Sequence, residues 1–130
     1  MLAEAPDGPL LHLRGRHQRG DLAAALSAAG IPCRDHIAYD QPALPLTDEA
    51  KGMLSGADRV YCPLFSPRTA GLFRKAVGSP PPPAVHVVAI SASAASALHG
   101  WGAPLDIARN PDAASVTLAL QAQIAAKNLP

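Results

Sequence analysis

The sequence predicts an α/β protein with a mainly parallel five-stranded sheet that is covered by helices on both faces. Two observations lead to this fold class. Short apolar segments alternate with helical segments five times along the chain, which is the pattern of strands joined by crossover helices. The composition is 48% hydrophobic and 16% charged, which is typical of a globular chain. Because such crossovers are right-handed, we expect a doubly wound sheet in a single α/β unit, residues 1–130.

The first predicted strand and helix lie near the N-terminus. The apolar run Pro9–Arg14 predicts a strand, and a basic loop containing glycines follows it. Asp21 is a good helix N-cap, because its carboxylate accepts hydrogen bonds from exposed backbone N–H groups. Leu22 and Leu26 share one face of the predicted helix. Gly30 then ends the helix, since glycine tolerates the left-handed conformation.

The middle of the chain adds a hinge between two further strands. Cys33–Asp40 predicts the second strand. The segment Gln41–Pro45 predicts an extended hinge, because each of its prolines disfavours helix at the residue before it. A short helix, capped by its first residue, is expected at 47–55. A third strand is expected at Arg59–Phe65, where Pro63 is unusual, because proline occurs in sheets at edges, ends or bulges.

The C-terminal half continues the alternation of strands and helices. Ser66 followed by Pro67 is an N-cap with a proline at the first helical position, which predicts a helix through Val77. Val85–Ile90 is rich in β-branched residues and is the strongest strand signal. The remaining predicted elements are a helix at 91–98, a strand at 104–108 and a helix at 112–127.

The loops after the strands are the candidate binding loops. In open α/β sheets, ligands bind beyond the carboxyl ends of the parallel strands, so a site is expected to gather there. These loops are Gly15–Gly20, Tyr39–Pro45, Ser66–Thr69, Ser91–Ser93 and Arg109–Asp112.

Charge and cysteine content exclude several classes of function. With 11 basic and 10 acidic residues the net charge is +1, which argues against a nucleic-acid or membrane-surface binder. No apolar run approaches the ~20 residues of a membrane span, and the N-terminus lacks the features of a signal peptide. Cys33 and Cys62 lack metal-ligand spacing. We therefore expect two buried thiols in a reducing cytoplasm, and neither a metal nor a cofactor.

A series of short motifs follows in a fixed order over about residues 9–125. They are Leu-Arg-Gly at a strand end (13–15), a helix ending in Ala-Gly-Ile (29–31), a strand ending in Tyr39 before Pro42, Phe-Ser-Pro at a helix start (65–67), a strand followed by small residues (87–98), and Ile-Ala-Arg-Asn-Pro before the last helix (107–111). In order and spacing they resemble the second repeat of the uroporphyrinogen-III synthase family. The sequence departs from the family pattern at Gln41, at Ser91-Ala92, where the family has Gly-Pro, and at Ala94.

The resemblance implies an enzyme of tetrapyrrole (haem) biosynthesis. Members of the family are lyases that convert linear hydroxymethylbilane to uroporphyrinogen III, with inversion of ring D, loss of water and no cofactor. Their active site is a cleft between two flavodoxin-like domains. The strand–helix unit that opens each repeat packs into the domain of the other repeat. Since the first repeat is absent here, the chain resembles the C-terminal half of such an enzyme.

The resemblance also implies roles for particular residues. Tyr39 corresponds to the cleft tyrosine, able to donate a hydrogen bond to the departing hydroxyl of the substrate. The substrate carries eight carboxylates, and the dense basic cluster at 14–19 suits them through charge-assisted hydrogen bonds. The N-termini of the helices that begin at Ser66 and Ser91 offer backbone N–H groups to anions. The predicted substrate-binding residues are Arg14, Gly15, Arg16, Arg19, Ser66, Pro67, Ser91 and Ser93, with His17 beside the arginines.

Two alternative functions also fit the sequence. The chain is also compatible with a non-catalytic flavodoxin-like binding module, although a receiver domain would need acidic residues where Arg14 stands and an aspartate in place of Ser66. It is equally compatible with an inactive synthase fragment. In that case Met1 is internal to a longer protein, and residues 2–6 are the end of an earlier helix.

The half-length match also predicts a partner. Residues 1–40 can leave the rest of the chain at the Gln41–Pro45 hinge and pack on a second copy. Two copies would then imitate the two-domain enzyme, and exchange of an identical element is a low-cost route to a dimer. We therefore expect a domain-swapped homodimer that binds a linear tetrapyrrole.

Overall fold

The computed structural model describes residues 8–127, which divide into two compact units. The boundary between the units lies between Ala43 and Leu44, inside the segment for which we predicted a hinge. The first unit is described over residues 8–43 and the second over residues 44–127. The predicted helix end at residues 2–6 lies outside the described residues.

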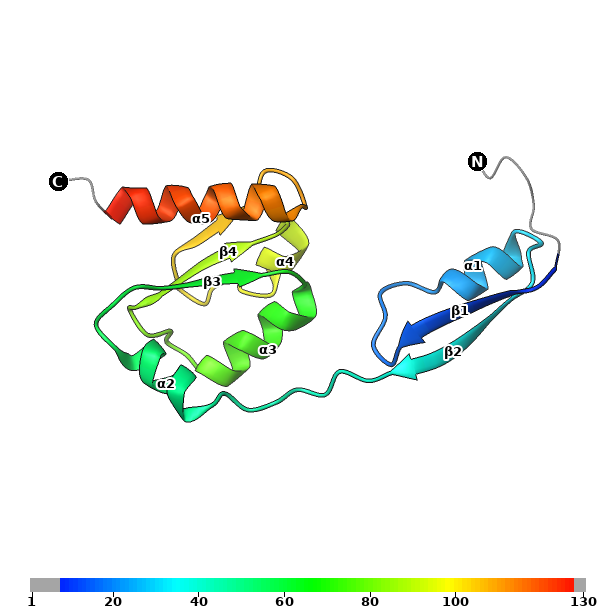
Figure 1. Ribbon diagram of the computed structural model, residues 1–130, viewed down its shortest axis with the longest axis horizontal. Helices are drawn as coiled ribbons and strands as arrows, with labels where there is room; N and C mark the ends of the chain where they lie inside the picture. The colour runs from blue at the N-terminus through cyan, green and yellow to red at the C-terminus, as the bar shows by residue number, and fades with distance from the viewer. Residues whose placement is uncertain (1–7, 128–130) are drawn as a thin grey trace. The chain divides into compact units, whose positions relative to one another are not determined.

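The first unit contains two parallel strands and one helix. They are β1 (Leu10–Gly15), α1 (Leu22–Ala28) and β2 (Cys33–Tyr39), and α1 lies along one side of the strand pair (Figure 1). The predicted N-cap is confirmed, because the Asp21 carboxylate accepts a hydrogen bond of 2.9 Å from the Ala24 N–H. Burial alternates along β1: Leu11 and Leu13 are 62% and 61% exposed, whereas the polar residues between and beyond them are half-buried.

The second unit contains a three-stranded parallel sheet with helices on both faces. Its strands lie in the order β3-β4-β5, with α5 on one face and α3 on the other (Figure 1). The sheet therefore confirms, for this unit, the predicted parallel arrangement. The elements are α2 (Asp48–Ser55), β3 (Val60–Leu64), α3 (Pro67–Val77), β4 (Val85–Ala89), α4 (Ala92–Ser96), β5 (Leu105–Ile107) and α5 (Ala113–Lys127).

The core of the second unit is built on β4. Val85 and Val87 are fully buried on the face of the sheet that packs against Leu64 and Trp101. Val88 is fully buried on the opposite face, under α5. Burying a valine side chain completely stabilises a fold by roughly 1.5–3 kcal/mol, so this short run of β-branched residues anchors both layers.

The expected single sheet of five strands is wrong, because the strands form one sheet of two and one of three. Pro63 lies in β3, an edge strand of the three-stranded sheet. Val60 donates its N–H to Ala84 and Leu64 accepts from Ile90, so these two residues face β4. Alternation along a strand then turns the position of Pro63 away from β4, so its missing N–H leaves the pairing of β3 with β4 intact. Sequence patterns reveal strands, but they do not reveal which edges pair.

Candidate functional site

The first unit holds a hollow at the carboxyl ends of its two strands. Its volume is about 380 Å³. Arg14, Gly15, Arg19 and Tyr39 of the predicted site line it, and so does His17. Gln18 also lines it, from the predicted loop Gly15–Gly20, and so does Leu22, the first residue of α1. Leu22 was expected only on one face of the helix, and that pattern carries no signal of a binding role.

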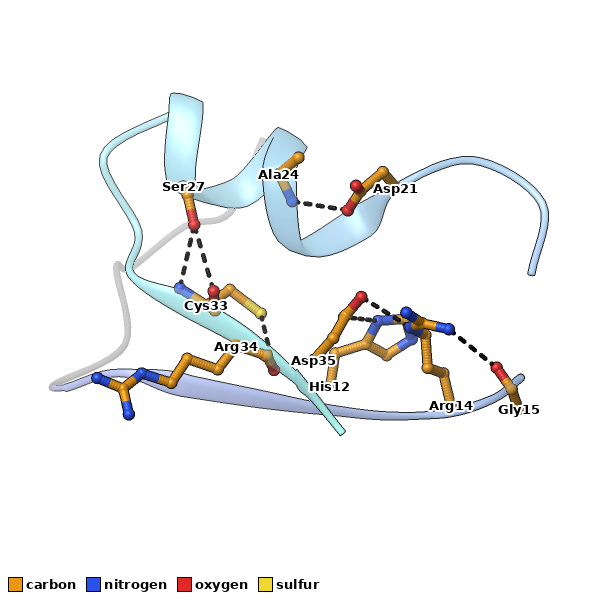
Figure 2. A network of polar contacts seen from close by, with 9 residues as sticks. All are labelled: His12, Arg14, Gly15, Asp21, Ala24, Ser27, Cys33, Arg34 and Asp35. Atoms are coloured by element: carbon orange, nitrogen blue, oxygen red, sulfur yellow. Dashed lines mark hydrogen bonds and ion pairs between the residues drawn. The ribbon is translucent and has the colours of Figure 1, made fainter. Parts of the chain in front are cut away.

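Arg14 is held in place by an acidic residue of the neighbouring strand. Its Nε donates to Asp35 Oδ2 over 2.7 Å, and its Nη1 donates to the Gly15 carbonyl over 3.1 Å (Figure 2). His12 Nδ1 lies 3.0 Å from the other oxygen of Asp35. The hydrogen bond from Arg14 is the main cause that lowers the pKa of Asp35 below its usual 3.8; partial burial opposes it and His12 assists it. Arg14 therefore presents a fixed guanidinium rather than a mobile one.

Arg16 and His17 surround a second aspartate, at the end of β2. Arg16 Nε donates to Asp40 Oδ2 over 2.7 Å, and His17 Nε2 lies 4.0 Å from Asp40 Oδ1. The hydrogen bond from Arg16 is the largest cause lowering the pKa of Asp40, and partial burial opposes it. The Arg16 side chain is 60% exposed, and such surface pairs are weak, so a carboxylate ligand can compete with Asp40 for it.

Arg19 differs from the other two arginines of the cluster. It is exposed, lines the hollow, and forms no ion pair within the described part of the chain. Because two carboxylates already offset Arg14 and Arg16, Arg19 supplies most of the positive charge that an incoming anion would meet first.

Tyr39 lies at the rim of this hollow and is 56% exposed, so its ring is not sealed in an apolar interior. The far end of the ring lies against Gly15. Tyr39 thus shares one hollow with Arg14 and Arg19.

The predicted serine positions lie in the second unit, at the carboxyl edge of its sheet. Ile90 N–H donates to the Leu64 carbonyl over 3.0 Å, which places the ends of β3 and β4 side by side. Ser66 Oγ accepts from Thr69 N–H over 3.0 Å, and Ser91 Oγ accepts from Ala94 N–H over 3.3 Å. Both serines are therefore engaged as helix caps.

The two helix starts differ in what they offer an anion. Pro67, the first residue of α3, contributes no N–H, although α3 is long enough to carry a helix dipole. Helix α4 has only five residues, and Ser93 is half-buried within its first turn. Arg109, from the predicted loop Arg109–Asp112, is exposed just after β5, where Ala108 N–H donates to the Ala89 carbonyl.

The described residues offer no metal site and no helix long and apolar enough to cross a bilayer. No group of three or more His, Cys, Asp or Glu side chains gathers between residues 8 and 127. Cys33 and Cys62 are free thiols, half-buried rather than fully buried as expected. Burial raises the pKa of the Cys62 thiol, which keeps it protonated at neutral pH.

The chain is similar to known proteins in sequence and in fold. The family model described as uroporphyrinogen-III synthase HemD matches residues 1–117. The crystal structure of uroporphyrinogen-III synthetase from Helicobacter pylori 26695 matches with a TM-score of 0.70 and 20% identity, over 91% of this chain and 55% of that chain. The chain thus spans about half the length of that protein, and the structural likeness shows a shared fold. No curated protein matches the chain significantly.

Proposed function

The chain belongs to the uroporphyrinogen-III synthase family, and we propose that it forms half of an enzyme that cyclises hydroxymethylbilane to uroporphyrinogen III. The proposed reaction is that of a lyase: ring D is inverted and water is lost. The observation that carries the proposal is the hollow of the first unit, where Tyr39 shares the carboxyl ends of two strands with Arg14 and Arg19. Two free, half-buried thiols fit a reducing cytoplasm, where we place the enzyme.

Each residue of the hollow takes a separate part in this proposal. Arg19, which lines the hollow, and the exposed Arg16, which does not line it, bind carboxylates of the linear tetrapyrrole. Arg14, fixed by Asp35, orients one of them. The Tyr39 phenol donates a hydrogen bond to the departing hydroxyl of the substrate. Help of this kind is worth about 10²–10⁴-fold where it is fully used.

The partner we propose is a second copy of the chain, exchanged through residues 1–40. The first unit offers a strand pair with one helix and two exposed leucines, Leu11 and Leu13, on β1. A two-stranded sheet is marginal alone, and burying those leucines would stabilise it. The length match supports the same idea, because this chain supplies about half of the related synthetase.

The isomer formed from hydroxymethylbilane tests the proposed reaction. Spontaneous closure gives the type I isomer, so an active protein enriches the type III isomer above the uncatalysed level. A product that is type I alone would point to the inactive fragment and would overturn the proposal.

Two substitutions separate binding from chemistry in the same assay. Arg19→Ala removes a carboxylate partner and raises KM about tenfold, since a charge-assisted hydrogen bond is worth at least about 1.5 kcal/mol. Tyr39→Phe keeps the ring and lowers kcat by at least about 10²-fold. Arg34→Ala is the matched control, because Arg34 is an exposed arginine of the same unit that lines a different hollow.

Light scattering over a wide concentration range tests the proposed partner. We expect a mass of two 13.4 kDa chains at high concentration. Leu13→Asp should return the protein to the mass of one chain, because it places a charge on the face to be buried. A strict monomer at every concentration would exclude the exchanged dimer.

A further inference from the structure

The strand pair of the first unit contains an irregularity just before its site. From Leu10 to Arg14 each residue of β1 pairs with the residue 23 positions later. Gly15 then pairs with Tyr39 instead of Ala38, so β2 holds one extra residue at this point. Arg16 N–H donates to the Tyr39 carbonyl over 2.9 Å and fixes the shifted backbone. Such bulges commonly redirect a side chain beside a functional site.

Gly15 is required there for space rather than for backbone freedom. It is buried, and it is not among the described glycines with positive φ. A Cβ added at Gly15 would lie 2.7 Å from Tyr39 Cε2, 2.9 Å from Cζ and 3.2 Å from the hydroxyl oxygen. The tyrosine ring therefore rests on a backbone surface that only glycine leaves open.

We propose that Gly15 and the bulge beside it are a positioning device that holds the Tyr39 phenol at the hollow. The bulge brings Tyr39 alongside Gly15, and the bare glycine lets the ring settle against the backbone. Arg14 completes the device, because its Nη1 holds the Gly15 carbonyl while its Nε is fixed by Asp35. The functional value of this device rests on the proposed role of Tyr39.

The geometry predicts an effect of Gly15→Ala that is confined to Tyr39. The atoms that the new Cβ would meet are the far end of an exposed side chain, so the ring can swing away while the fold persists. A structural glycine would instead unfold the strand pair on substitution.

NMR on the full chain with Tyr61→Phe as background tests the device. That change leaves Tyr39 as the sole tyrosine of the chain. It removes a hydroxyl that is buried without a hydrogen-bond partner among the described residues, so the fold should tolerate it. We expect cross-relaxation between the Tyr39 ring and the Gly15 α-protons, and a ring-current shift of the α-proton signals. Tyr39→Leu should abolish the shift and Tyr39→Phe should retain it.

Gly15→Ala should remove the contact between residue 15 and the ring while the other amide signals of β1 and β2 stay in place. Gly71→Ala is the matched control, because a Cβ at Gly71 meets nothing within 4 Å, and it should leave the Tyr39 signals unchanged. The proposed device would be overturned if the parent shows no contact between the ring and Gly15, or if the Tyr39 signals stay unchanged in Gly15→Ala. Either result would overturn it whether or not the protein forms the type III isomer.

The isomer assay then reports on function separately. In the assembly that forms the type III isomer, Gly15→Ala should lower kcat by up to about 100-fold at little-changed KM, since a small misplacement of a reacting group costs that much. Adding Gly15→Ala to Tyr39→Phe should cause no further loss. A displaced ring with unchanged kcat would overturn both the functional value of the device and the proposed role of Tyr39.

Discussion

The two units of the chain are stabilised in opposite ways. In the second unit three valines of β4 are fully buried between helices on both faces of the sheet. In residues 8–43 the one buried apolar side chain is Ala23, and positions of β1 that could carry a core carry His12 and Arg14 instead. In β1, polar side chains that suit a binding site thus occupy the positions where apolar side chains would form a core. The second unit supplies stability, and the first supplies the candidate chemistry.

Hydrogen exchange of backbone amides should show the largest contrast between the units. In dilute solution the amides of β4 should exchange only by global unfolding, whereas those of β1 and β2 should exchange by local opening. Because the proposed dimer covers the first unit, protection of β1 and β2 should rise with protein concentration while that of β4 does not. If the amides of β1 and β2 were protected as strongly as those of β4 in the dilute monomer, the two units would not differ in stability.

The same substitution in each unit should have very different costs. Leu64→Ala empties a site in the core of the second unit and should lower the free energy of unfolding by about 2–5 kcal/mol. Leu13→Ala acts at an exposed position and should change it by less than about 0.5 kcal/mol in the monomer. Denaturant unfolding followed by Trp101 fluorescence measures the cost of Leu64→Ala. Exchange of β1 amides measures the cost of Leu13→Ala. Comparable costs would mean that the first unit has a core of its own.

Acid should weaken the first unit through Asp35. Its pKa is lower in the folded chain than the usual 3.8, so its contribution to stability is present above that value and is lost as the pH falls through the folded pKa. We expect the protection of β2 amides from exchange to decline below pH 3.8. In Asp35→Asn the β2 amides should be less protected at pH 6, but their protection should not decline further in acid. Asp58→Asn, an exposed aspartate of the second unit, is the control. An acid decline that persists in Asp35→Asn would assign it to another group.

The local features of the fold could be predicted from the sequence, and the long-range ones could not. The helix caps Asp21, Thr47, Ser66 and Ser91 are all confirmed, because a cap bonds to a residue only three positions further along the chain. The division into two sheets depends on which strand edges pair. Pro63 indicated an edge, an end or a bulge, and β3 is an edge strand of its sheet, but a proline does not tell which other strands share that sheet.

The candidate site shows the same division. Arg14, Gly15, Arg19 and Tyr39 were selected from the sequence, and the structure places them around one hollow. The partner of Arg14 was missed, because Asp35 lies 21 residues away and meets it only through the register of two strands. The bulge that brings Tyr39 to Gly15 has no recognisable sequence pattern either, since it depends on one unpaired residue in β2.

We propose that this chain is half of a ring-inverting synthase and that its activity requires a second copy. The dependence of type III isomer formation on protein concentration is the sharpest test of this proposal. We predict that the rate rises as the square of the concentration in dilute protein and becomes linear once the dimer predominates. Product that is type I alone at every concentration, or a type III rate that is linear throughout, would contradict the claim.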